Sequence, residues 1–467
     1  MIERLKTLLL ATLVFLSVFQ YGILLSETKE PVYQLPAYQL GEGVPTLSYP
    51  RLDVLAVPIR MVAHFRNTKY DPANDSEPLV SKHAFLRNRV RYFSNIWSFT
   101  LELLLDHPSI DISQIKPVEP QEWDTYSPSI ELILCRPLPL SIWFDLVGVN
   151  LSGEATELII DRLYLSGIHD DLVLISDGAG GIYSLPLRMK ADVVDAFLLI
   201  CEEGVSPILP FDVSAYGLQT AHQVYTLGSS NVSQWYYVSS LDESLFDELA
   251  TRAFANSTTL RITQDPDSTN TIFEDNERRL LMESNQIVLE QTRINPGAEH
   301  PYTIWQETAA ILSRMELLPE DSFYFDGFYS TAARQHIAFQ QAKDGYPVFY
   351  IEDSAQGESI VSTLRARGRS GELVSLRYRP LRLTNIRENV AVLSLDRLLE
   401  IFTAEKQELP DGESLPLLRG IYEGFLCRPG STTTQPVWII EFIDGRRYFY
   451  DLATGEYQGY LQPIVVS

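Results

Sequence analysis

Cysteine and basic residues are both scarce in this chain. The three cysteines, Cys135, Cys201 and Cys427, form no Cys-x-x-Cys pair, which argues against a zinc ribbon, a thioredoxin-type redox motif and a disulfide framework. We expect them to be small, buried core residues. The 467 residues include 37 Lys and Arg against 61 Asp and Glu, so the formal net charge is −24. Such an acidic surface repels phosphates, which argues against nucleic acid and anionic lipid head groups as partners.

Catalytic motifs are missing as well. The sequence has no G-x-S-x-G elbow and no P-loop, and no two of its seven histidines stand four residues apart as in H-E-x-x-H. The His-Asp-Asp at residues 169–171 could ligate a metal, but a surface turn explains it more simply. Asp321 and Asp326 could pair as glycosidase carboxylates, as could almost any two of the 61 acidic residues. The motif search therefore finds no catalytic constellation, and we expect no cofactor and no metal.

One long apolar run stands near the N-terminus, at residues 7–25. As a helix it would span roughly 28 Å, close to one hydrocarbon core, and no later run approaches about 18 uncharged residues. Arg4 and Lys6 precede the run whereas Glu27, Lys29 and Glu30 follow it, which keeps the N-terminus in the cytoplasm. A cleaved signal peptide is the alternative, but no Ala-x-Ala-like site follows. We predict a single-pass anchor in the cell membrane, with the bulk of the chain extracytoplasmic.

Four residues of this predicted transmembrane helix fall on one stripe, namely Leu13, Ser17, Gln20 and Leu24. A serine and a glutamine on one face can form hydrogen bonds with a neighbouring transmembrane helix. The stripe is therefore a candidate partner-binding site. The alternative is that Gln20, near the outer end of the helix, simply reaches toward water.

The predicted organisation is a cytoplasmic tail, the transmembrane anchor, a stiff spacer rich in Pro, Tyr and Gly, and three extracytoplasmic domains. Their bounds, in this order, are residues 1–6, 7–25, 26–50, 51–204, 211–299 and 300–467. Short strand-like runs outnumber helices after the spacer, which predicts the α+β class with antiparallel sheets and a few helices.

Apolar residues at spacings of three and four predict the helices of these domains. The predicted helices are residues 81–106, 191–203, 241–255, 302–317 and 395–406. Residues 60–78 are predicted to be irregular. Gly-containing turns at residues 177–181, 344–347 and 443–446 predict tight connections between successive strands.

Several short motifs stand in an order that is typical of a known family. They are residues 6–10 (KTLLL), 244–246 (SLF), 273–280 (FEDNERRL), 295–296 (NP), 344–348 (DGYPV) and 435–438 (QPVW). Together with the anchor, they resemble the YycH family. Its members are accessory proteins of the WalK/WalR (YycG/YycF) two-component system in low-GC Gram-positive bacteria. The resemblance extends over the whole layout of the chain.

The resemblance implies a function that the motif search does not give. YycH-like proteins are not enzymes. Together with the related protein YycI, they associate with the WalK (YycG)-type sensor histidine kinase, largely through transmembrane helices, and set its activity over cell-wall turnover. The family's C-terminal region is similar to YycI, so residues 300–467 would be the YycI-like part.

Two other classes of function stay open from the residues alone. One is an extracytoplasmic sensor that binds a wall-derived or peptide ligand, which a concave pocket with convergent polar groups would favour. The other is a wall-modifying hydrolase, which a buried carboxylate pair at glycosidase separation or an ordered metal would favour.

Overall fold

The computed structural model describes much of one compact unit of the chain, residues 49–467. The described residues are 57–461 apart from gaps at 66–82, 87–90, 108, 119–127, 153–157, 168–172, 178–180, 186, 189, 203–206, 226–230, 239–240, 242, 255–259, 265–269, 284, 292–300, 316, 318–322, 331–334, 344, 355–356, 370–371 and 407–414. The predicted tail, anchor, stripe and spacer lie outside them. Among these residues, every helix is too short or too polar to cross a membrane.

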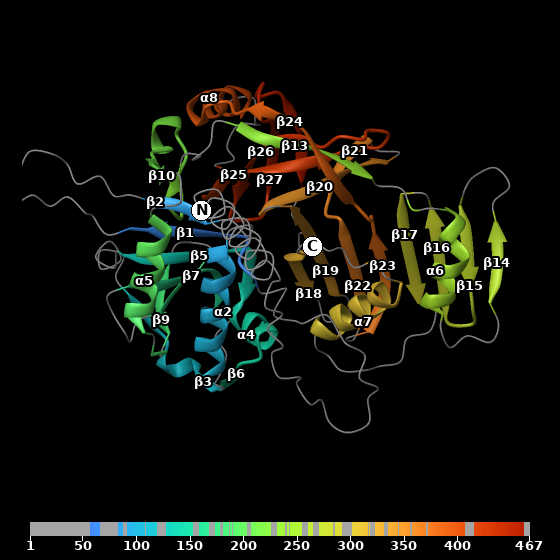
Figure 1. Cartoon of the computed structure of the whole chain (residues 1–467), viewed down its shortest axis with the longest axis horizontal. Coiled ribbons are helices and arrows are strands. Elements are labelled where there is room, and N and C mark those ends of the chain that lie inside the picture. The colour runs from blue at the N-terminus through green and yellow to red at the C-terminus, as the bar shows by residue number, and fades with distance from the viewer. Residues whose placement is uncertain are drawn as a thin grey trace, which may run out of the picture. The chain divides into compact units, whose positions relative to one another are not determined.

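The first sheet has eight antiparallel strands (Figure 1). In spatial order they are β10 (Pro207–Ile208), β2 (His83–Leu86), β1 (Arg60–His64), β5 (Ser129–Pro139), β7 (Ile159–Ser166), β8 (Val173–Ser176), β9 (Ile182–Leu185) and β4 (Lys116–Val118). Three helices pack on one face, α2 (Arg91–Leu105), α4 (Leu140–Val147) and α5 (Ala191–Glu202). Alternation along β5 sends Ile130 and Leu132 into this helical layer, so Glu131 points to the other face.

The second sheet has fourteen strands. Its main path is β14 (Arg261–Gln264), β15 (Thr271–Glu274), β16 (Arg278–Glu283), β17 (Gln286–Gln291), β23 (Glu372–Tyr378), β22 (Leu364–Arg369), β19 (Gln335–Lys343), β20 (Tyr346–Ser354), β25 (Leu418–Cys427), β26 (Gln435–Phe442), β27 (Arg447–Asp451) and β28 (Tyr457–Leu461). Off this path, β18 (Phe323–Ser330) pairs with β19 and β21 (Gly357–Val361) pairs with β20. The pairing of β20 with β25 is parallel and the others described are antiparallel, which confirms the predicted α+β class.

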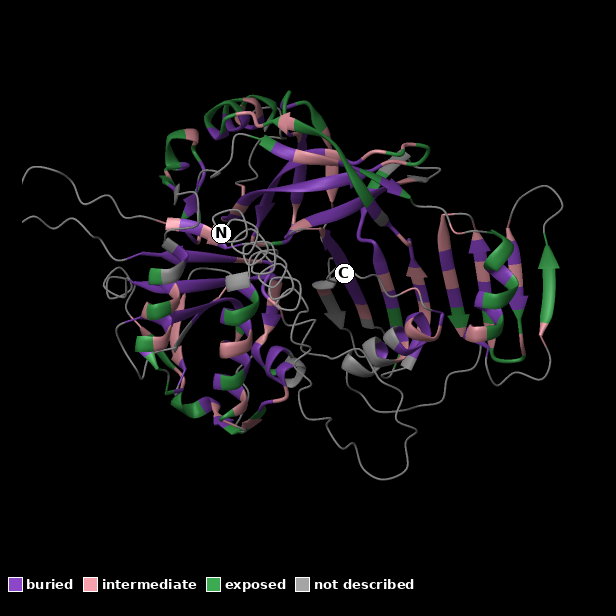
Figure 2. Cartoon of the chain, in the orientation of Figure 1, coloured by how far each residue is buried: buried purple, intermediate pink, exposed green. Residues whose placement is uncertain are grey.

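Helices cover this sheet in two places. The helix α7 (Pro301–Arg314) packs on β22 and β23, and α6 (Phe246–Ala253) packs beside α7. The helix α8 (Leu395–Lys406) buries Leu398 and Phe402 against Phe442 and Tyr450 of the C-terminal strands. A separate ribbon pairs β13 (Asn231–Val238) with β24 (Arg382–Ala391). Figure 2 shows that β14, at the end of the sheet, is exposed along its length.

Three local predictions were wrong. The helix expected at residues 81–106 begins only at Arg91, because residues 83–86 pair with β1 as strand β2. Residues 60–64 are a strand rather than irregular, and Met61 and Val62 are fully buried on its two faces. The helix α4 was missed because it is only eight residues long and follows β5 directly, although its buried residues, Leu140, Trp143, Phe144 and Val147, have helical spacing. The pairing of successive strands expected at the three turns was confirmed, because β8–β9, β19–β20 and β26–β27 are antiparallel neighbours. Residues 178–180 and 344 of these turns lie outside the described residues.

The second sheet crosses the boundary predicted at residue 299, because β17 pairs directly with β23 through Leu289 and Leu376. The division of residues 51–467 into three independent domains therefore stays a prediction.

Candidate functional site

A long bulge in strand β5 creates the centre of the site. Ile133 pairs with Arg162 of β7 and Leu138 pairs with Ile160, so four residues of β5 face Asp161 alone. The carbonyl groups of residues 134 and 135 therefore have no ladder partner on β7. A buried carbonyl needs a hydrogen-bond donor, and the second sheet supplies one.

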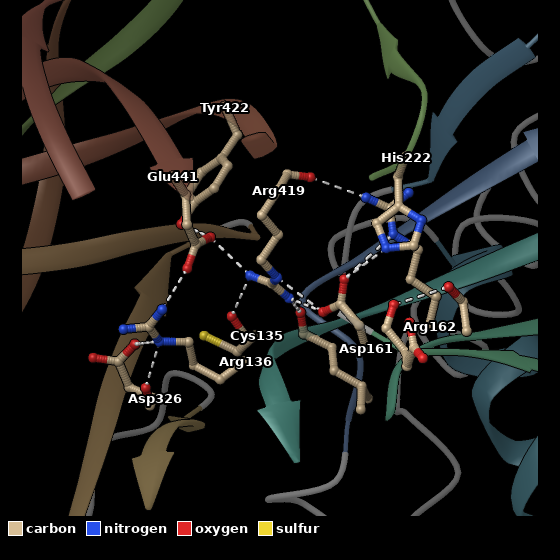
Figure 3. A network of polar contacts seen from close by, with 12 residues as sticks. Cys135, Arg136, Asp161, Arg162, His222, Asp326, Arg419, Tyr422 and Glu441 are labelled. Carbon is tan, nitrogen blue, oxygen red and sulfur yellow. Dashed lines mark hydrogen bonds and ion pairs between the residues drawn. The ribbon is translucent and has the colours of Figure 1, made fainter. Parts of the chain in front are cut away.

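Arg419 of β25 is that donor. Its guanidinium donates to the carbonyls of Leu134 (2.7 Å) and Cys135 (2.9 Å), and also to Asp161 (2.8 Å from Nε to Oδ1) and Glu441 (2.7 Å from Nη1 to Oε2). Its side chain is only 5% exposed. One arginine thus joins both sheets, as Figure 3 shows.

Glu441 of β26 extends the network through the second sheet. It accepts hydrogen bonds from Tyr422 (2.7 Å), Arg136 (2.8 Å) and Arg447 (3.0 Å) in addition to Arg419. Burial raises the pKa of Glu441, but its arginine neighbours outweigh burial and lower it to about 2. Glu441 is therefore ionised at neutral pH although it is fully buried.

Asp326 of β18 closes this end of the network. Its carboxylate binds Arg447 (2.7 Å) and accepts a hydrogen bond from Ser362 (2.6 Å), and its backbone carbonyl accepts one from Arg136 (2.9 Å). Asp326 was one of two candidate glycosidase acids, and the other, Asp321, lies outside the described residues. Because both of its oxygens face buried partners, Asp326 is placed to hold strands together rather than to transfer a proton.

Glu131 of β5 carries the network toward the outer strands of the first sheet. It forms an ion pair with Arg162, and its Oε2 lies 3.1 Å from Nε2 of His64. Nδ1 of His64 lies 2.8 Å from Nδ1 of His83. Burial raises the pKa of Glu131, but Arg162 and His64 lower it to about 2, so Glu131 is ionised at neutral pH and accepts a hydrogen bond from His64. In the contact between the two Nδ1 atoms, one ring must donate and the other accept.

Burial and the neighbouring His64 lower the pKa of His83 to about 4. A third histidine, His222, places Nε2 at 3.3 Å from Asp161, and burial together with the charge of Arg162 lowers its pKa. The pKa values of His83 and His222 thus favour their neutral forms at neutral pH.

The charges of the network balance. Arg136, Arg162, Arg419 and Arg447 face Glu131, Asp161, Asp326 and Glu441. A paired and hydrogen-bonded network of this kind fixes the relative position of its strands, because removing one partner leaves a buried charge uncompensated. The network therefore has a structural role, which is to hold the two sheets in one arrangement.

The predicted partner-binding stripe, Leu13, Ser17, Gln20 and Leu24, lies outside the described residues, as does the His-Asp-Asp at residues 169–171. The three cysteines are free and buried, as predicted. Within the part of the chain that the structure describes, groups of three or more His, Cys, Asp or Glu that could hold a metal are absent.

The network residues were missed from the sequence, although a signal for them exists. Each is a charge inside a largely apolar strand. Glu441 stands alone in PVWIIEF, whereas SIELILCRPLP contains both Glu131 and Arg136 and IIDRLYLS contains both Asp161 and Arg162. A charge at such a position must be paired when the strand is buried on both faces. The sequence alone does not say which distant charge is its partner.

The fold and the buried network define an α+β scaffold in which antiparallel sheets are held by ion pairs. One solved structure, YycH from Bacillus subtilis, is similar to this chain. The alignment covers 84% of this chain and 95% of the YycH chain, with 12% sequence identity and a TM-score of 0.54. The YycH resemblance is therefore confirmed at the level of the fold. No family model matches the chain, and none of the curated proteins does.

Two further solved structures are similar over a smaller part of the chain. An uncharacterized protein from Eubacterium rectale covers 51% of this chain and 86% of its own, with 11% identity and a TM-score of 0.32. The YpeB C-terminal domain of Bacillus megaterium covers 48% of this chain and 100% of its own, with 10% identity and a TM-score of 0.27. These TM-scores are too low to carry an argument.

Proposed function

We propose that this chain is a membrane-anchored, extracytoplasmic regulator of a WalK (YycG)-type sensor histidine kinase that controls cell-wall metabolism, and that it is not an enzyme. The observation that carries the proposal is the YycH fold over 84% of the chain. The order of the short sequence motifs supports it independently. The apolar run at residues 7–25 supports a single-pass location in the cell membrane, with the N-terminus in the cytoplasm.

The kinase contact is proposed to lie in the membrane. A single transmembrane helix can influence a kinase by packing beside the transmembrane helices of that kinase. Ser17 and Gln20 are polar groups placed to make such a contact, on the stripe with Leu13 and Leu24. A YycI-like protein is the proposed second partner.

Replacing Gln20 with Leu tests this contact. The change makes the helix more apolar, so the protein should still reach the membrane. It should weaken association with the kinase about 2- to 30-fold, since hydrogen bonds between transmembrane helices contribute about 0.5–2 kcal/mol. Ser17→Phe should add a steric block on the same face. The measurements are co-purification of WalK and YycI and the output of a kinase-dependent reporter, at matched protein levels.

The matched control is Phe15→Leu, which changes the opposite side of the helix and should have little effect. If Gln20→Leu and Ser17→Phe both behave like Phe15→Leu, the membrane stripe is not the contact. The extracytoplasmic surface then becomes the better candidate. If neither WalK nor YycI co-purifies with the unmodified chain, the proposed function itself is wrong.

A further inference from the structure

Four arginines gather on one face of the second sheet. Arg365, Arg367 and Arg369 stand at alternate positions of β22, and Arg377 of β23 is the direct cross-strand neighbour of Arg365. We call these four residues the arginine face. Alternate residues of a strand point to the same side, so the four side chains leave the sheet in one direction.

This side of the sheet is the one that helix α7 does not cover. Leu364, Ala366 and Leu376 alternate with the arginines, are buried and belong to the core that includes Ile304 of α7. The α7 contact also includes a hydrogen bond from the backbone nitrogen of Leu373 to Glu307 (3.0 Å). On the opposite side, the side chains of Arg365 and Arg377 are 35% and 42% exposed. Arg367 and Arg369 are exposed as well.

The arginine face carries more positive charge than its neighbours neutralise. Glu352 of β20 is shared by Arg365 (2.9 Å), Arg377 (2.9 Å) and the buried Arg379 (2.6 Å). Within the described ranges, Arg367 and Arg369 form no ion pair. Like charges on directly opposed residues, as at Arg365 and Arg377, are unfavourable in an antiparallel pair. Glu352 bridges these two guanidiniums, so the positive charge without a bridging carboxylate lies at Arg367 and Arg369.

One acidic residue stands beside the arginine face: Glu372 of β23 is the cross-strand neighbour of Arg369, so it offsets part of the charge excess but leaves Arg367 without an acidic cross-strand neighbour. His336 of β19 is the cross-strand neighbour of Arg367 on one side, and Ser375 of β23 is its neighbour on the other. The next residue in that row is Glu290 of β17, which lies 3.9 Å from Arg279 of β16. Glu290 is thus separated from Arg367 by a full strand and has an arginine of its own.

We propose that the arginine face binds a short, extended acidic segment of a partner protein, with carboxylates at alternate residues. Successive arginines of β22 are about 6.6–6.8 Å apart, which is the spacing of alternate side chains in an extended peptide. Glu352 shows that a carboxylate fits between these guanidiniums. A long phosphate polymer fits less well, because it would continue onto the surface of a chain whose net charge is −24.

The test uses the purified full-length chain in a nonionic detergent. The probe is a fluorescein-labelled ten-residue peptide of alternating Glu and Ser, followed by fluorescence anisotropy at low salt. A peptide with Gln in place of Glu and an inorganic polyphosphate of similar length serve as comparisons. We expect binding of the Glu peptide, loss of binding with the Gln peptide, and weakening as salt screens the charges.

The decisive variant is the double substitution Arg367→Gln and Arg369→Gln, which should weaken binding of the Glu peptide about 5- to 30-fold. The matched control is Arg387→Gln with Arg397→Gln, which removes two exposed arginines elsewhere on the chain. The control should bind as the unmodified protein does. Circular dichroism verifies that both variants are folded.

Three results would overturn the inference. They are no binding of the Glu peptide at low salt, equal losses in the two double variants, and polyphosphate binding that is tighter than peptide binding. The first two would mean that the arginine face is not a specific site, and the third would mean that its ligand is a phosphate polymer. The assay contains no kinase, so its outcome is separate from that of the proposed function.

Discussion

Replacing Arg419 with Met should test how strongly the buried network holds the two sheets together. The change removes the donors to Leu134, Cys135, Asp161 and Glu441 while keeping a long apolar side chain. Glu441 would keep three donors, but Asp161 would keep only Arg162 at 3.6 Å and His222 at 3.3 Å. Asp161 therefore accounts for most of the loss.

Breaking a buried pair by removing one partner costs about 3–5 kcal/mol. With a urea dependence of roughly 3 kcal/mol per molar, the unfolding midpoint should fall by roughly 1–2 M. The assay is urea unfolding of the full-length chain, followed by tryptophan fluorescence and by far-ultraviolet circular dichroism. If Arg419 couples the sheets, the two signals should coincide in the unmodified chain and separate in the variant.

Arg397→Met is the matched control, because Arg397 forms an exposed pair with Glu400 in α8. Such a pair contributes about 0.5 kcal/mol or less. Adding Asp161→Asn to Arg419→Met should recover part of the loss, since it removes the uncompensated charge. The reasoning is refuted if Arg419→Met and Arg397→Met unfold at the same urea concentration.

Three further predictions concern acid, thiols and topology. Because neighbouring arginines lower the pKa of Glu441 to about 2 from an ordinary 4.5, the free energy of unfolding should fall as pH drops from about 4.5 toward 2, and urea titrations at several pH values should show a smaller fall in Glu441→Gln. Burial raises the pKa of Cys135 to about 12 and of Cys201 to about 11. A thiol reagent should therefore label native protein slowly, and replacing all three cysteines with Ala should cost about 1–3 kcal/mol per site without loss of kinase control. A reporter fused after Ser467 should be active only outside the cytoplasm, and a cytoplasmic signal would contradict the predicted anchor.

Regular elements with a clear period were predictable from the sequence. The helix predicted at residues 395–406 has those bounds in the structure, because Leu395, Leu398, Leu399 and Phe402 form one apolar stripe. The C-terminal hairpin was predictable from its turn, where Gly445 adopts a φ of 89° that favours glycine.

Elements buried on both faces were harder to predict. Strand β1 is four buried residues after Arg60, and so short a run fits neither the alternating nor the helical pattern. For β1, tertiary burial removes the contrast between faces on which sequence patterns depend. The helix α4 differs, because its buried residues Leu140, Trp143, Phe144 and Val147 do fall on one helical face. It was hard to predict because its eight residues follow β5 without a break, so the run looks like the continuation of an apolar strand.

The candidate site was not predictable for a different reason. In the sequence, Arg419 is an ordinary charged residue at the start of a strand. Its hydrogen-bond partners depend on a bulge in β5 that no sequence pattern predicts. Pairing between residues so far apart follows from topology, which local patterns do not contain. Charges within apolar strands mark the participants but not their pairing.

The bulge of β5 also affects how the chain can fold as it is synthesised. Asp161 and the carbonyls at residues 134 and 135 emerge first, whereas Arg419 is 258 residues later than Asp161 and 285 residues later than Leu134. Until β25 has been synthesised, the carbonyls of residues 134 and 135 and the carboxylate of Asp161 lack their main hydrogen-bond donor, Arg419. A chain that stops before residue 419 can pair the strands of the first sheet but leaves this surface open to water and proteases. Arg419 therefore makes the stability of the earliest part of the protein depend on synthesis of the last.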